Sequence, residues 1–469
     1  MHMSPFNVLP LKAAFLANLD TLGYREMTTI QQRSLPHVLK GRDLLAQAET
    51  GSGKTVAFGI GILHRLDPAR LKVQGLVLCP TRELADQVAN ELRRLARGEG
   101  NIKVLTLTGG VPLRHQVTSL EHGVHIVVGT PGRIRDHLAR GSINLEDVHT
   151  LVLDEADRMT DMGFYDEMAS IVCACPRTRQ TLLFSATYPD NIKQTTAEFL
   201  NDPVEVVVDA QHTATQIKQL FYEIGFDERD AAIGRLLNHF KPLSTLVFCN
   251  TRVHCRELAE ELQAQGFSAL GLHGDLEQRE RDEILVLFSN RSCSVLVATD
   301  VAARGLDISR LDAVMNADVS RDTEVHVHRV GRTGRAGEAG LALTLCSPNE
   351  KKWVSLIEDY QKTTVQWANL DDLDSETAET SPAPMVTLWI MGGKKDKLRP
   401  GDVLGALTGD AGLLREQVGK ITVSEFMTYV AIDRIVADQA FQRLTRGGAP
   451  GRNVGAFKGR SFKMRLIKV

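Results

Sequence analysis

The amino-acid sequence predicts an α/β fold made of two tandem parallel-sheet domains, followed by a smaller α+β domain. Through most of the 469 residues, short apolar runs with strand character alternate with amphipathic helical stretches, a pattern typical of βαβ units around a parallel sheet. The alternation pauses over residues 201–215 and then begins again, which predicts a second domain of the same class. An acidic stretch at 371–384 then separates a tail with a different order of elements.

The expected strands of the two larger domains are short and rich in Val, Ile and Leu. Those of the first domain are Leu76–Cys79, Ile126–Val128, Leu151–Leu153 and Thr181–Phe184. Those of the second domain are Thr245–Phe248, Ser294–Val297, Ala313–Met315 and Leu341–Leu345. Residues 81–97 between two strands are apolar at every third or fourth position, the spacing of a helix with one buried face. We therefore expect the first domain over residues 1–208 and the second over 209–367.

Residues 368–384 are expected to form a flexible linker, because residues 371–384 are acidic, contain Ser, Thr and Pro and hold few large apolar side chains. The tail domain, residues 385–469, is expected to fold in the order βαββαβ. Its expected elements are strand Val386–Met391, helix Asp402–Thr408, strands Lys420–Val423 and Thr428–Ile432, helix Val436–Leu444 and strand Phe462–Ile467.

Charge is distributed unevenly along the chain. The whole sequence has 55 basic and 58 acidic residues, a net charge of −3, which by itself argues against a nucleic-acid partner. The tail domain alone has 15 basic and 7 acidic residues, a net charge of +8, so the remainder carries −11. A basic module on an acidic body is typical of a protein in which one module binds a polyanion. A solvated face of lysines and arginines on a small domain would give the same count.

Composition argues against a membrane or secreted protein. No apolar run approaches the ~18 residues that span a bilayer, and the N-terminal residues lack the basic and apolar regions of a secretory signal. The seven cysteines are scattered, and no Cys/His set has the spacing of metal ligands. We therefore expect a reduced, cytoplasmic protein with no membrane partner and no zinc site.

A glycine-rich segment at residues 48–55, AETGSGKT, follows an apolar stretch and precedes a helical one. Its glycines allow successive backbone N–H groups to face phosphate oxygens, and the start of a helix adds partial positive charge. Lys54 is expected to reach the β- and γ-phosphates of a nucleotide, and Thr55 to offer its hydroxyl to Mg²⁺. The segment therefore predicts a phosphate-binding loop, although Ala48 replaces the usual first glycine.

Two neighbouring carboxylates, Asp154 and Glu155, end an apolar run about a hundred residues further on, in the string Asp-Glu-Ala-Asp. Carboxylates at the carboxyl end of a parallel strand lie where such sheets bind ligands. Asp154 is expected to hold Mg²⁺ and Glu155 to orient an attacking water. Together with the phosphate-binding loop, they predict phosphoryl transfer from a nucleoside triphosphate.

These motifs together resemble those of the DEAD-box ATP-dependent RNA helicases, over about residues 6–365. Gly23-Tyr24 through Gln31, with Phe6 upstream, match the Q motif of that family, which selects adenine, although Met27 stands where the family usually has proline. Residues 48–55 and 154–157 match motifs I and II, and residues 185–187, Ser-Ala-Thr, match motif III, which couples hydrolysis to strand separation. The resemblance implies RecA-like folds for the two larger domains, ATP and Mg²⁺ as cofactors, and RNA as the partner.

The resemblance also assigns functions to individual residues. The catalytic residues would be Glu155, Lys54, Asp154 and two arginine fingers of motif VI, Arg332 and Arg335. The cofactor-binding residues would be Phe6, Tyr24, Gln31, Thr50, Gly51, Ser52, Gly53, Lys54, Thr55 and Asp307, of which Thr55, together with Asp154, would hold the metal. The coupling residues would be Ser185, Thr187 and His328. The residues that contact RNA would be Arg82, Gly110, Thr130, Arg133, Asn250, Thr251, Gly274, Thr299 and Arg304.

Neither of the two larger domains carries a complete catalytic set on this assignment. The first holds nucleotide and metal, and the second supplies the guanidinium groups that stabilise charge on the γ-phosphoryl oxygens, an effect worth ~10³–10⁵ in rate. Hydrolysis is therefore expected to wait until the domains close. If closure also completes an RNA groove, ATP and RNA binding become reciprocally coupled.

The tail domain resembles the RNA-recognition-motif (RRM) domain of the DbpA subfamily of DEAD-box helicases, which tethers those enzymes to a hairpin of 23S ribosomal RNA during large-subunit assembly. The resemblance rests on the βαββαβ order, the Gly-Gly-Lys-Lys loop at residues 392–395 and the Arg-Pro-Gly-Asp run at 399–402. It assigns RNA contacts to Lys394, Lys395, Lys397 and Arg399. The aromatic signature of RRM sheets is poor here, with Phe426 and Tyr429 as the nearest candidates. A basic edge that holds phosphates and loop bases is therefore favoured over stacking on the sheet.

The sequence predicts an RNA-stimulated ATPase that unwinds RNA duplexes locally. Two alternatives remain open at this point. A DNA translocase on the same pair of domains is disfavoured by Gln31 and by the Asp-Glu-Ala-Asp string. An ATP-gated RNA clamp or assembly scaffold with little unwinding would share every motif named above.

Overall fold

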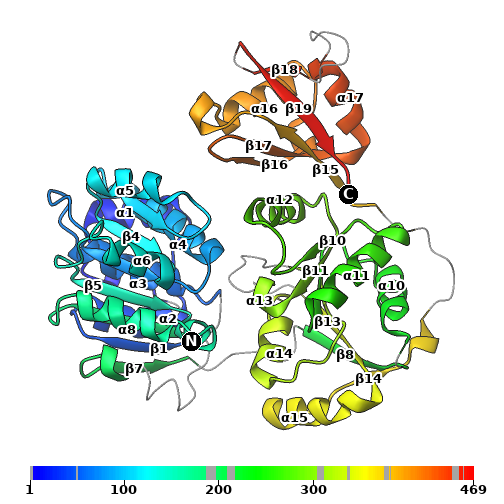
Figure 1. Ribbon diagram of the computed structural model, residues 1–469, viewed down its shortest axis with the longest axis horizontal. Helices are drawn as coiled ribbons and strands as arrows, with labels where there is room; N and C mark the ends of the chain where they lie inside the picture. The colour runs from blue at the N-terminus through cyan, green and yellow to red at the C-terminus, as the bar shows by residue number, and fades with distance from the viewer. Residues whose placement is uncertain are drawn as a thin grey trace. The chain divides into compact units, whose positions relative to one another are not determined.

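The computed structural model describes residues 4–48, 51–185, 197–208, 217–225, 227–303, 311–334, 339–373, 380, 382–445, 454–457 and 459–469 (Figure 1). The described residues up to 208 form one compact unit, and those from 217 onward form a second. No helix among the described residues is long and apolar enough to cross a membrane.

The first unit is a seven-stranded parallel sheet covered by helices, as the alternating pattern predicts. Its strands, in the sheet order β3-β4-β2-β5-β6-β1-β7, are β1 (Leu44–Gln47), β2 (Gly75–Leu78), β3 (Val104–Leu107), β4 (Ile126–Gly129), β5 (Thr150–Asp154), β6 (Gln180–Ser185) and β7 (Val204–Val207). Its helices are α1 (Ala13–Thr21), α2 (Thr29–Val38), α3 (Lys54–Arg65), α4 (Arg82–Leu95), α5 (Leu113–Glu121), α6 (Pro131–Ala139), α7 (Ala156–Asp161) and α8 (Tyr165–Ala174).

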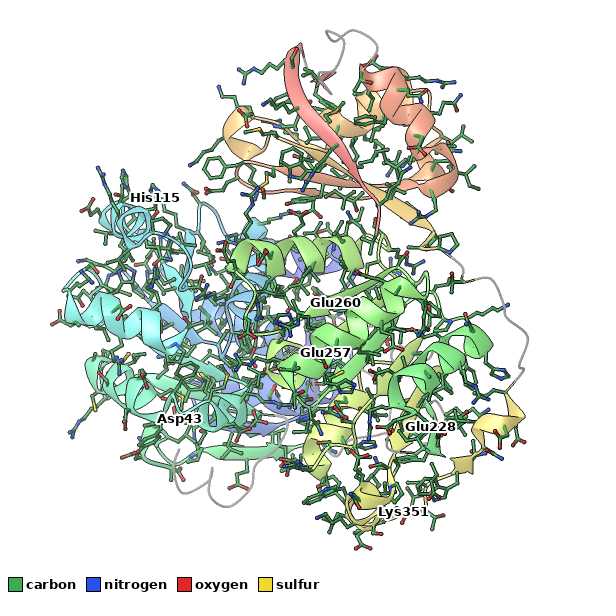
Figure 2. All side chains as sticks on the ribbon, turned by 45° about the vertical axis from the view of Figure 1, so that its right-hand side comes forward. Asp43, His115, Glu228, Glu257, Glu260 and Lys351 are labelled. Atoms are coloured by element: carbon green, nitrogen blue, oxygen red, sulfur yellow. The ribbon has the colours of Figure 1, made fainter. Side chains whose placement is uncertain are left out.

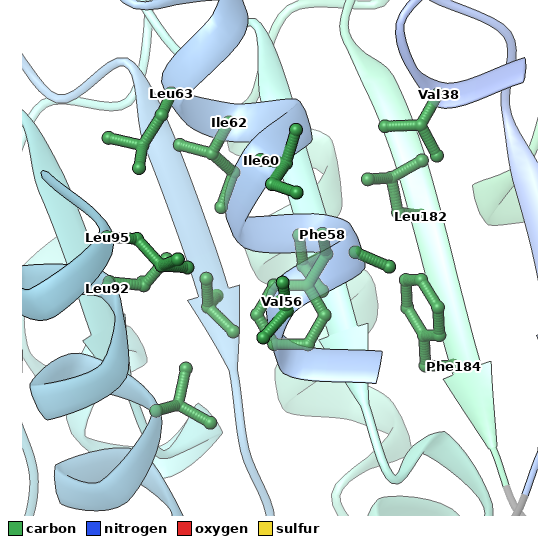
Figure 3. Close-up of a cluster of buried hydrophobic side chains, with 14 of the residues drawn as sticks. Val38, Val56, Phe58, Ile60, Ile62, Leu63, Leu92, Leu95, Leu182 and Phe184 are labelled. Carbon is green, nitrogen blue, oxygen red and sulfur yellow. The ribbon is translucent and has the colours of Figure 1, made fainter. Parts of the chain in front are cut away.

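Helix α3 is buried along most of its length because it packs between the sheet and its neighbours α2 and α4 (Figure 3). The ring of Phe58 lies 5.4 Å from that of Phe184 on β6, measured between centroids. Gly61 allows the helix to approach α2 closely, since a Cβ there would lie 2.3 Å from Cγ1 of Val38. Such tight apolar packing fixes the start of α3, and with it the phosphate-binding loop, against the sheet.

Asp43, labelled in Figure 2, immediately precedes β1 and accepts two backbone hydrogen bonds from neighbouring segments. One carboxylate oxygen accepts from the backbone N–H of Thr181 at 2.8 Å, and the other accepts from that of Asn201 at 2.7 Å. Burial raises the pKa of Asp43, and these two hydrogen bonds oppose that effect.

The second unit contains a parallel sheet with the same strand order as the first, advanced by seven: β10-β11-β9-β12-β13-β8-β14. The strands are β8 (Ile217–Glu223), β9 (Thr245–Cys249), β10 (Ala269–Leu272), β11 (Val295–Thr299), β12 (Ala313–Asn316), β13 (Gly340–Cys346) and β14 (Trp367–Ala368). The helices are α10 (Arg229–Phe240), α11 (Arg252–Ala264), α12 (Gln278–Ser289), α13 (Asp300–Ala303), α14 (Thr323–Val330) and α15 (Lys351–Gln361). On α11, Glu257 and Glu260 lie on the solvent face (Figure 2).

The tail domain has the expected βαββαβ order plus one strand that the sequence pattern did not predict. Its antiparallel sheet has the order β16-β17-β15-β19-β18. The elements are β15 (Met385–Ile390), α16 (Pro400–Gly409), β16 (Val418–Val423), β17 (Thr428–Asp433), α17 (Arg434–Thr445), β18 (Val454–Phe457) and β19 (Arg460–Ile467). The added strand, β18, is short and pairs only with β19.

The stretch expected to be a linker is anchored at both ends. Its first part continues the second parallel sheet, because β14 pairs with β8 and the buried Leu370 and Leu373 join the core of that domain. Near its end, Ala383 is fully buried and its N–H donates to Ser268 Oγ at 3.3 Å. The low hydrophobicity of the segment concealed these few apolar anchors. Residues 374–379 and 381 lie outside the described residues.

Candidate functional site

The predicted nucleotide residues of the first unit gather at the carboxyl edge of three adjacent strands, β5, β6 and β1. The phosphate-binding loop follows β1, Glu155 follows β5, and Ser185 ends β6. The backbone N–H of Ala48 donates to the carbonyl of Ser185 at 2.9 Å, which joins the loop directly to the strand of motif III. Parallel sheets bind ligands at this edge.

The described part of the phosphate-binding loop has the backbone that its glycines allow. Gly51 and Gly53 have φ values of +85° and +97°, a region that residues with a Cβ rarely adopt. Lys54 begins α3, is only 6% exposed, and donates from Nζ to the carbonyl oxygen of Ala48 at 3.1 Å. Ser52 and Thr55 flank it at the same helix start. The loop thus offers backbone N–H groups, a buried cation and a hydroxyl to an anion.

Gln31 links the Q motif to this loop. Its side-chain Nε2 donates to the carbonyl of Gly53 at 3.0 Å, and its Oε1 accepts from the N–H of Thr28 at 2.9 Å, which caps the start of α2. A Cβ on Gly53 would lie 2.5 Å from Nε2 of Gln31, so glycine is also needed for this approach.

The two aromatic residues of the predicted Q motif are placed differently from each other. Phe6 is 3% exposed and belongs to the apolar core of the first unit. Tyr24 is half-buried, and its hydroxyl donates to Glu91 Oε1 at 2.7 Å. Burial, followed by the interaction with Glu91, raises the pKa of Tyr24 to about 12. The structure therefore shows packing and hydrogen-bonding partners for both rings on their own domain.

Asp154 and Glu155 are both buried, at 3% and 8% exposure. Oδ1 of Asp154 has no hydrogen-bond partner among the residues that the structure describes. Burial raises the pKa of Asp154 to about 7, and the nearby Lys54 opposes that rise while the neighbouring Glu155 adds to it. The Asp154 carboxylate lies at the same edge of the sheet as the helix start that carries the Thr55 hydroxyl. These are the oxygen ligands that Mg²⁺ prefers, so the two residues fit the metal that the sequence implied.

Glu155 has a strained backbone. Its φ of +53° and ψ of +52° place a residue with a Cβ in the left-handed region, where it precedes the first residue of α7. Such conformations cost about 1–3 kcal/mol and cluster at active sites. The strain turns the chain sharply after β5 and holds the Glu155 side chain at the edge of the sheet.

The RNA residues predicted in the first unit lie at the other half of the same edge, after β2, β3 and β4. Arg133 donates from Nη1 to the carbonyl of Val111 at 2.9 Å and to Gln116 Oε1 at 2.7 Å. Arg82 lies close enough to Arg133 to lower its pKa further, although burial is the larger cause. Gly109 packs against the guanidinium group of Arg82. Its neighbour Gly110 has a φ of +78°, and Thr130 precedes the first residue of α6. Two arginines beside a glycine turn form a surface suited to phosphates.

The second unit repeats this arrangement. Thr251 caps the start of α11 as Thr81 caps the start of α4, and each hydroxyl accepts from the N–H three residues on, at 3.2 Å and 3.3 Å. The predicted RNA residues of this unit lie at the ends of three adjacent strands. Asn250 and Thr251 follow β9, Gly274 follows β10, and Thr299 is the last residue of β11. The equivalence of Cys-Asn-Thr-Arg at 249–252 with Cys-Pro-Thr-Arg at 79–82 is visible in the sequence, and comparing the two segments would have found it.

Arg329 is a residue that the sequence analysis missed. Its side chain is 1% exposed, and its guanidinium pairs with Asp300 through Nε at 2.7 Å and Nη2 at 2.6 Å. It also donates to Asn250 Oδ1 at 2.9 Å and to the carbonyl of Asp318 at 2.8 Å. Arg329 therefore joins α14, which carries motif VI, to Asn250 after β9 and Asp300 after β11. His328 and Arg332 lie beside it, the first on α14 and the second just after it.

Five predicted site residues lie outside the described residues, namely Thr50, Thr187, Arg304, Asp307 and Arg335.

A second charged group surrounds His254 on α11. Its Nε2 lies 2.9 Å from Asp230 Oδ1, and its Nδ1 lies 3.1 Å from Asp318 Oδ2. Hydrogen bonds to Asp230, Asp318 and Cys249 raise the pKa of His254 to about 12, against the effect of burial. Burial pushes the pKa of Asp318 up, but the hydrogen bonds from His254 and Asn250 outweigh it and lower that pKa. His254 is thus an imidazolium held between two carboxylates.

We expect the His254→Gln substitution to destabilise the second unit more at pH 6 than at pH 9. A histidine whose pKa is raised on folding stabilises the folded state fully at pH values below its unfolded pKa, near 6.5. This stabilisation is lost as the pH rises toward the folded pKa of about 12. The difference in free energy of unfolding between wild type and variant should shrink by roughly 1 kcal/mol per pH unit between pH 7 and 9. Urea unfolding followed by tryptophan fluorescence measures this, because all three tryptophans, Trp353, Trp367 and Trp389, belong to the second unit.

The matched control is His115→Gln, which removes an exposed imidazole from the first unit (Figure 2). It should leave the tryptophan-detected transition unchanged at both pH values. A pH-independent cost of His254→Gln would contradict the charged pairing.

The basic loop of the tail domain follows β15. Lys394 and Lys395 lie in a short 3₁₀ helix, Lys397 has a φ of +59°, and Arg399 precedes the first residue of α16. All four side chains are exposed. The structure thus brings the four predicted RNA contacts of this domain onto one loop.

The face of the tail sheet that carries Thr387 is covered within the second unit. Thr387 Oγ1 accepts from Asn290 Nδ2 at 3.1 Å and lies 2.7 Å from Ser292 Oγ, and all three residues are buried. At the edge of this contact, Arg465 Nη2 pairs with Glu283 at 3.1 Å. Tyr429, one of the two aromatic candidates, is only 6% exposed. Stacking of bases on this face is therefore blocked, as the weak aromatic signature suggested.

Family models match most of the chain in three parts. A model of the DEAD/DEAH box helicase family matches residues 28–195, a model of the helicase conserved C-terminal domain matches 228–337, and a model of the DbpA RNA binding domain matches 387–456. Among curated relatives, the ATP-dependent RNA helicase DbpA of Escherichia coli strain K12 is 49% identical over 465 residues, 99% of each chain. The DEAD-box ATP-dependent RNA helicase CshA of Bacillus cereus is 42% identical over 378 residues, 80% of this chain and 71% of its own.

Solved structures of DEAD-box helicases are also similar to this chain. S. cerevisiae Dbp5 bound to RNA and ADP BeF3 is 28% identical, with a TM-score of 0.70, and the match covers 78% of this chain and 96% of that one. The DEAD-box helicase Mss116 bound to ssRNA and UDP-BeF is 25% identical, with a TM-score of 0.71 over 78% of this chain and 80% of that one.

Proposed function

Because the chain belongs to the DbpA family of DEAD-box RNA helicases, it is an ATP-dependent RNA helicase, and we propose that its tail domain tethers it to 23S ribosomal RNA during assembly of the large ribosomal subunit. Tethered in this way, it would unwind nearby duplexes locally, with ATP hydrolysis. The proposed domains are residues 1–208, 209–367 and 385–469.

In the proposed ATP site, Gln31 selects adenine and Lys54 holds the β- and γ-phosphates. Thr55 and Asp154 would hold Mg²⁺, which neutralises phosphate charge when bound. Glu155 accepts the proton of the attacking water. The proposal places Arg332 and Arg335 as arginine fingers from the second domain.

The contact between Gln31 and Gly53 supports the nucleotide assignment most directly. Gln31 donates a hydrogen bond to the backbone of the phosphate-binding loop. Binding of the adenine base by Gln31 would therefore be coupled to the position of the loop that binds the phosphates.

The basic loop after β15 carries the tethering proposal. Four exposed cations at 394–399 stand on the domain that matches the DbpA RNA binding model. That domain is fixed to the second parallel-sheet domain through Thr387, Asn290 and Ser292. RNA held by the loop would therefore be held on the same unit as the helicase motifs of the second parallel-sheet domain.

ATP hydrolysis should be measured against a panel of RNAs that includes 23S fragments, matched unrelated RNAs and DNA. We expect stimulation by one ribosomal fragment well above the others. Duplexes with a 3′ overhang, a 5′ overhang or a tethered ribosomal hairpin then test unwinding, with the tethered substrate opening fastest. Hydrolysis without opening of any duplex would instead identify an ATP-gated clamp, and equal stimulation by every RNA would end the tethering proposal.

Replacing Lys394, Lys395 and Lys397 together by Gln should weaken binding of the ribosomal fragment and flatten its salt dependence. If each lysine neutralises one phosphate, the slope of log K against log salt should fall by about 2–3. Filter binding at several salt concentrations measures both quantities in the full chain.

A charge-matched control replaces Lys218, Lys241 and Lys362, which are exposed on the second parallel-sheet domain, by Gln. This control should retain the wild-type slope. If the two triple variants behave alike, the effect is one of net charge and the basic loop is not the tether.

A further inference from the structure

Phe426 is the one strongly exposed aromatic ring of the tail domain among the residues that the structure describes. It lies in the turn between β16 and β17, and 56% of it is exposed. In contrast, Tyr429 is buried, and Trp389 is half-buried with the guanidinium of Arg465 5.1 Å from its ring centroid. An exposed phenylalanine costs free energy in water unless a ligand covers it.

The basic loop is hydrogen-bonded to the turn that carries Phe426. The backbone N–H of Lys394 donates to the carbonyl of Ser424 at 2.9 Å, and that of Lys395 donates to the carbonyl of Glu425 at 3.0 Å. Nζ of Lys395 lies 4.2 Å from the ring centroid of Phe426. The loop and the turn therefore form a single surface that combines an aromatic ring with cations.

The two glycines before the lysines make this contact possible. A Cβ on Gly393 would lie 2.5 Å from the carbonyl oxygen of Ser424 and 2.6 Å from the carbonyl of Glu425. A Cβ on Gly392 would lie 2.4 Å from the ring of Phe462. The Gly-Gly-Lys-Lys segment thus does more than supply charge, because its glycines let the lysines reach the aromatic turn.

A further cation stands beside this surface. Arg460 is exposed and its Nη1 donates to the carbonyl of Asp396, at the end of the same 3₁₀ helix, at 3.1 Å. We define the Phe426 platform as Phe426 together with Lys394, Lys395 and Arg460.

We propose that the Phe426 platform binds an unpaired RNA loop nucleotide, with the base stacked on the Phe426 ring and its flanking phosphates held by Lys394, Lys395 and Arg460. This inference rests on the proposed function and specifies which part of the RNA the tail recognises. Single-stranded RNA is recognised by stacking unpaired bases on aromatic rings beside cations. A perfect duplex offers no such base, so the platform favours a hairpin loop over its stem.

The proposed position of the stacked base at Phe426 also agrees with the covered face of the tail sheet. In this chain the face bearing Thr387 is covered by Asn290 and Ser292. Among the described residues of the tail domain, the strongly exposed aromatic ring is that of Phe426, at the edge of the domain.

The test measures binding of a 23S ribosomal hairpin, and of the same hairpin with each loop nucleotide in turn made abasic, to the full chain. The variants are Phe426→Leu, which removes the ring, and Phe426→Tyr, which retains it. Stacking contributes about 1–3 kcal/mol per base, so Phe426→Leu should weaken binding by about 5- to 150-fold and Phe426→Tyr by much less. One abasic substitution in the loop should weaken hairpin binding by the wild-type protein by a similar factor. The same abasic hairpin should bind the Phe426→Leu variant as tightly as the intact hairpin does.

Tyr360→Leu is the matched control, because Tyr360 is a 50% exposed aromatic on α15 of the second parallel-sheet domain. It should bind every hairpin as wild type does. Tryptophan-detected unfolding verifies that Phe426→Leu still folds, as its exposure predicts.

Two results separate this inference from the proposed function. Suppose that wild type prefers the ribosomal hairpin, and that Phe426→Leu keeps this preference and still loses affinity for the abasic hairpin as wild type does. The proposed stacking on Phe426 is then wrong, while the proposed tethering by the tail domain is supported. If wild type binds the ribosomal hairpin no better than an unrelated hairpin of equal length, the tether itself is wrong.

Discussion

Replacing Glu155 by Gln should reduce ATP turnover by about 10²–10⁴-fold while ATP still binds. The carboxylate is the proposed acceptor of the proton from the attacking water, and general-base groups contribute factors of this size. Gln has the same shape, so the left-handed backbone at this position, with its φ of +53°, keeps the same Cβ and the same strain. Steady-state hydrolysis at saturating RNA measures the turnover, and equilibrium binding of ATP measures the ground state.

A carboxylate elsewhere on the first unit provides the control for this result. Asp166→Asn removes an exposed charge from the first turn of α8 and should leave turnover unchanged. Turnover of Glu155→Gln within a few-fold of wild type would mean that another group activates the water. A parallel loss of ATP binding would mean that the substitution disturbs the phosphate-binding loop and not the proton transfer.

Replacing Arg329 by Met should destabilise the second unit by about 3–5 kcal/mol. The Arg329 side chain is buried and Asp300 is partly buried, so removal of the guanidinium leaves the Asp300 charge poorly compensated. Asp300, Asn250 and the Asp318 carbonyl would all lose their bonds from Arg329. The expected result is a shift of the tryptophan-detected urea transition to lower denaturant.

Arg329→Lys distinguishes charge from geometry in this network. A single ammonium cannot reproduce the two parallel bonds to Asp300, so we expect an intermediate loss of stability and a clear loss of RNA-stimulated turnover. Arg321→Met, at an exposed arginine shortly before α14, should change neither quantity. An Arg329→Met protein as stable as wild type would show that the network adds nothing to the fold.

The sequence predicted most of the fold because the strands of parallel sheets are apolar on both faces. Runs such as residues 151–153 and 313–315 could only be buried strands, and both lie centrally in their sheets. The glycine-rich loop and the carboxylates after β5 were equally clear, since their chemistry depends on neighbours in sequence.

Residues whose importance comes from distant partners could not be predicted in this way. Arg329 bonds residues 29 and 79 positions away along the chain, and its own neighbours, His328 and Val330, say nothing of that. The charge on His254 likewise depends on Asp230 and Asp318. Strand β18 was not predicted because it is only four residues long and Gly455 and Ala456 separate its two strand-forming residues, Val454 and Phe457.

The buried contact of Thr387 with Asn290 and Ser292 limits how freely this tail can be exchanged between helicases. A chimera that grafts the tail onto a foreign catalytic core would bury the Thr387 hydroxyl against a surface that lacks Asn290 and Ser292, its partners in this chain. Each orphaned buried group costs about 1–3 kcal/mol. Engineers who want to retarget such an enzyme should therefore transplant the basic loop and its aromatic turn into the existing tail, and leave the seam between the modules intact.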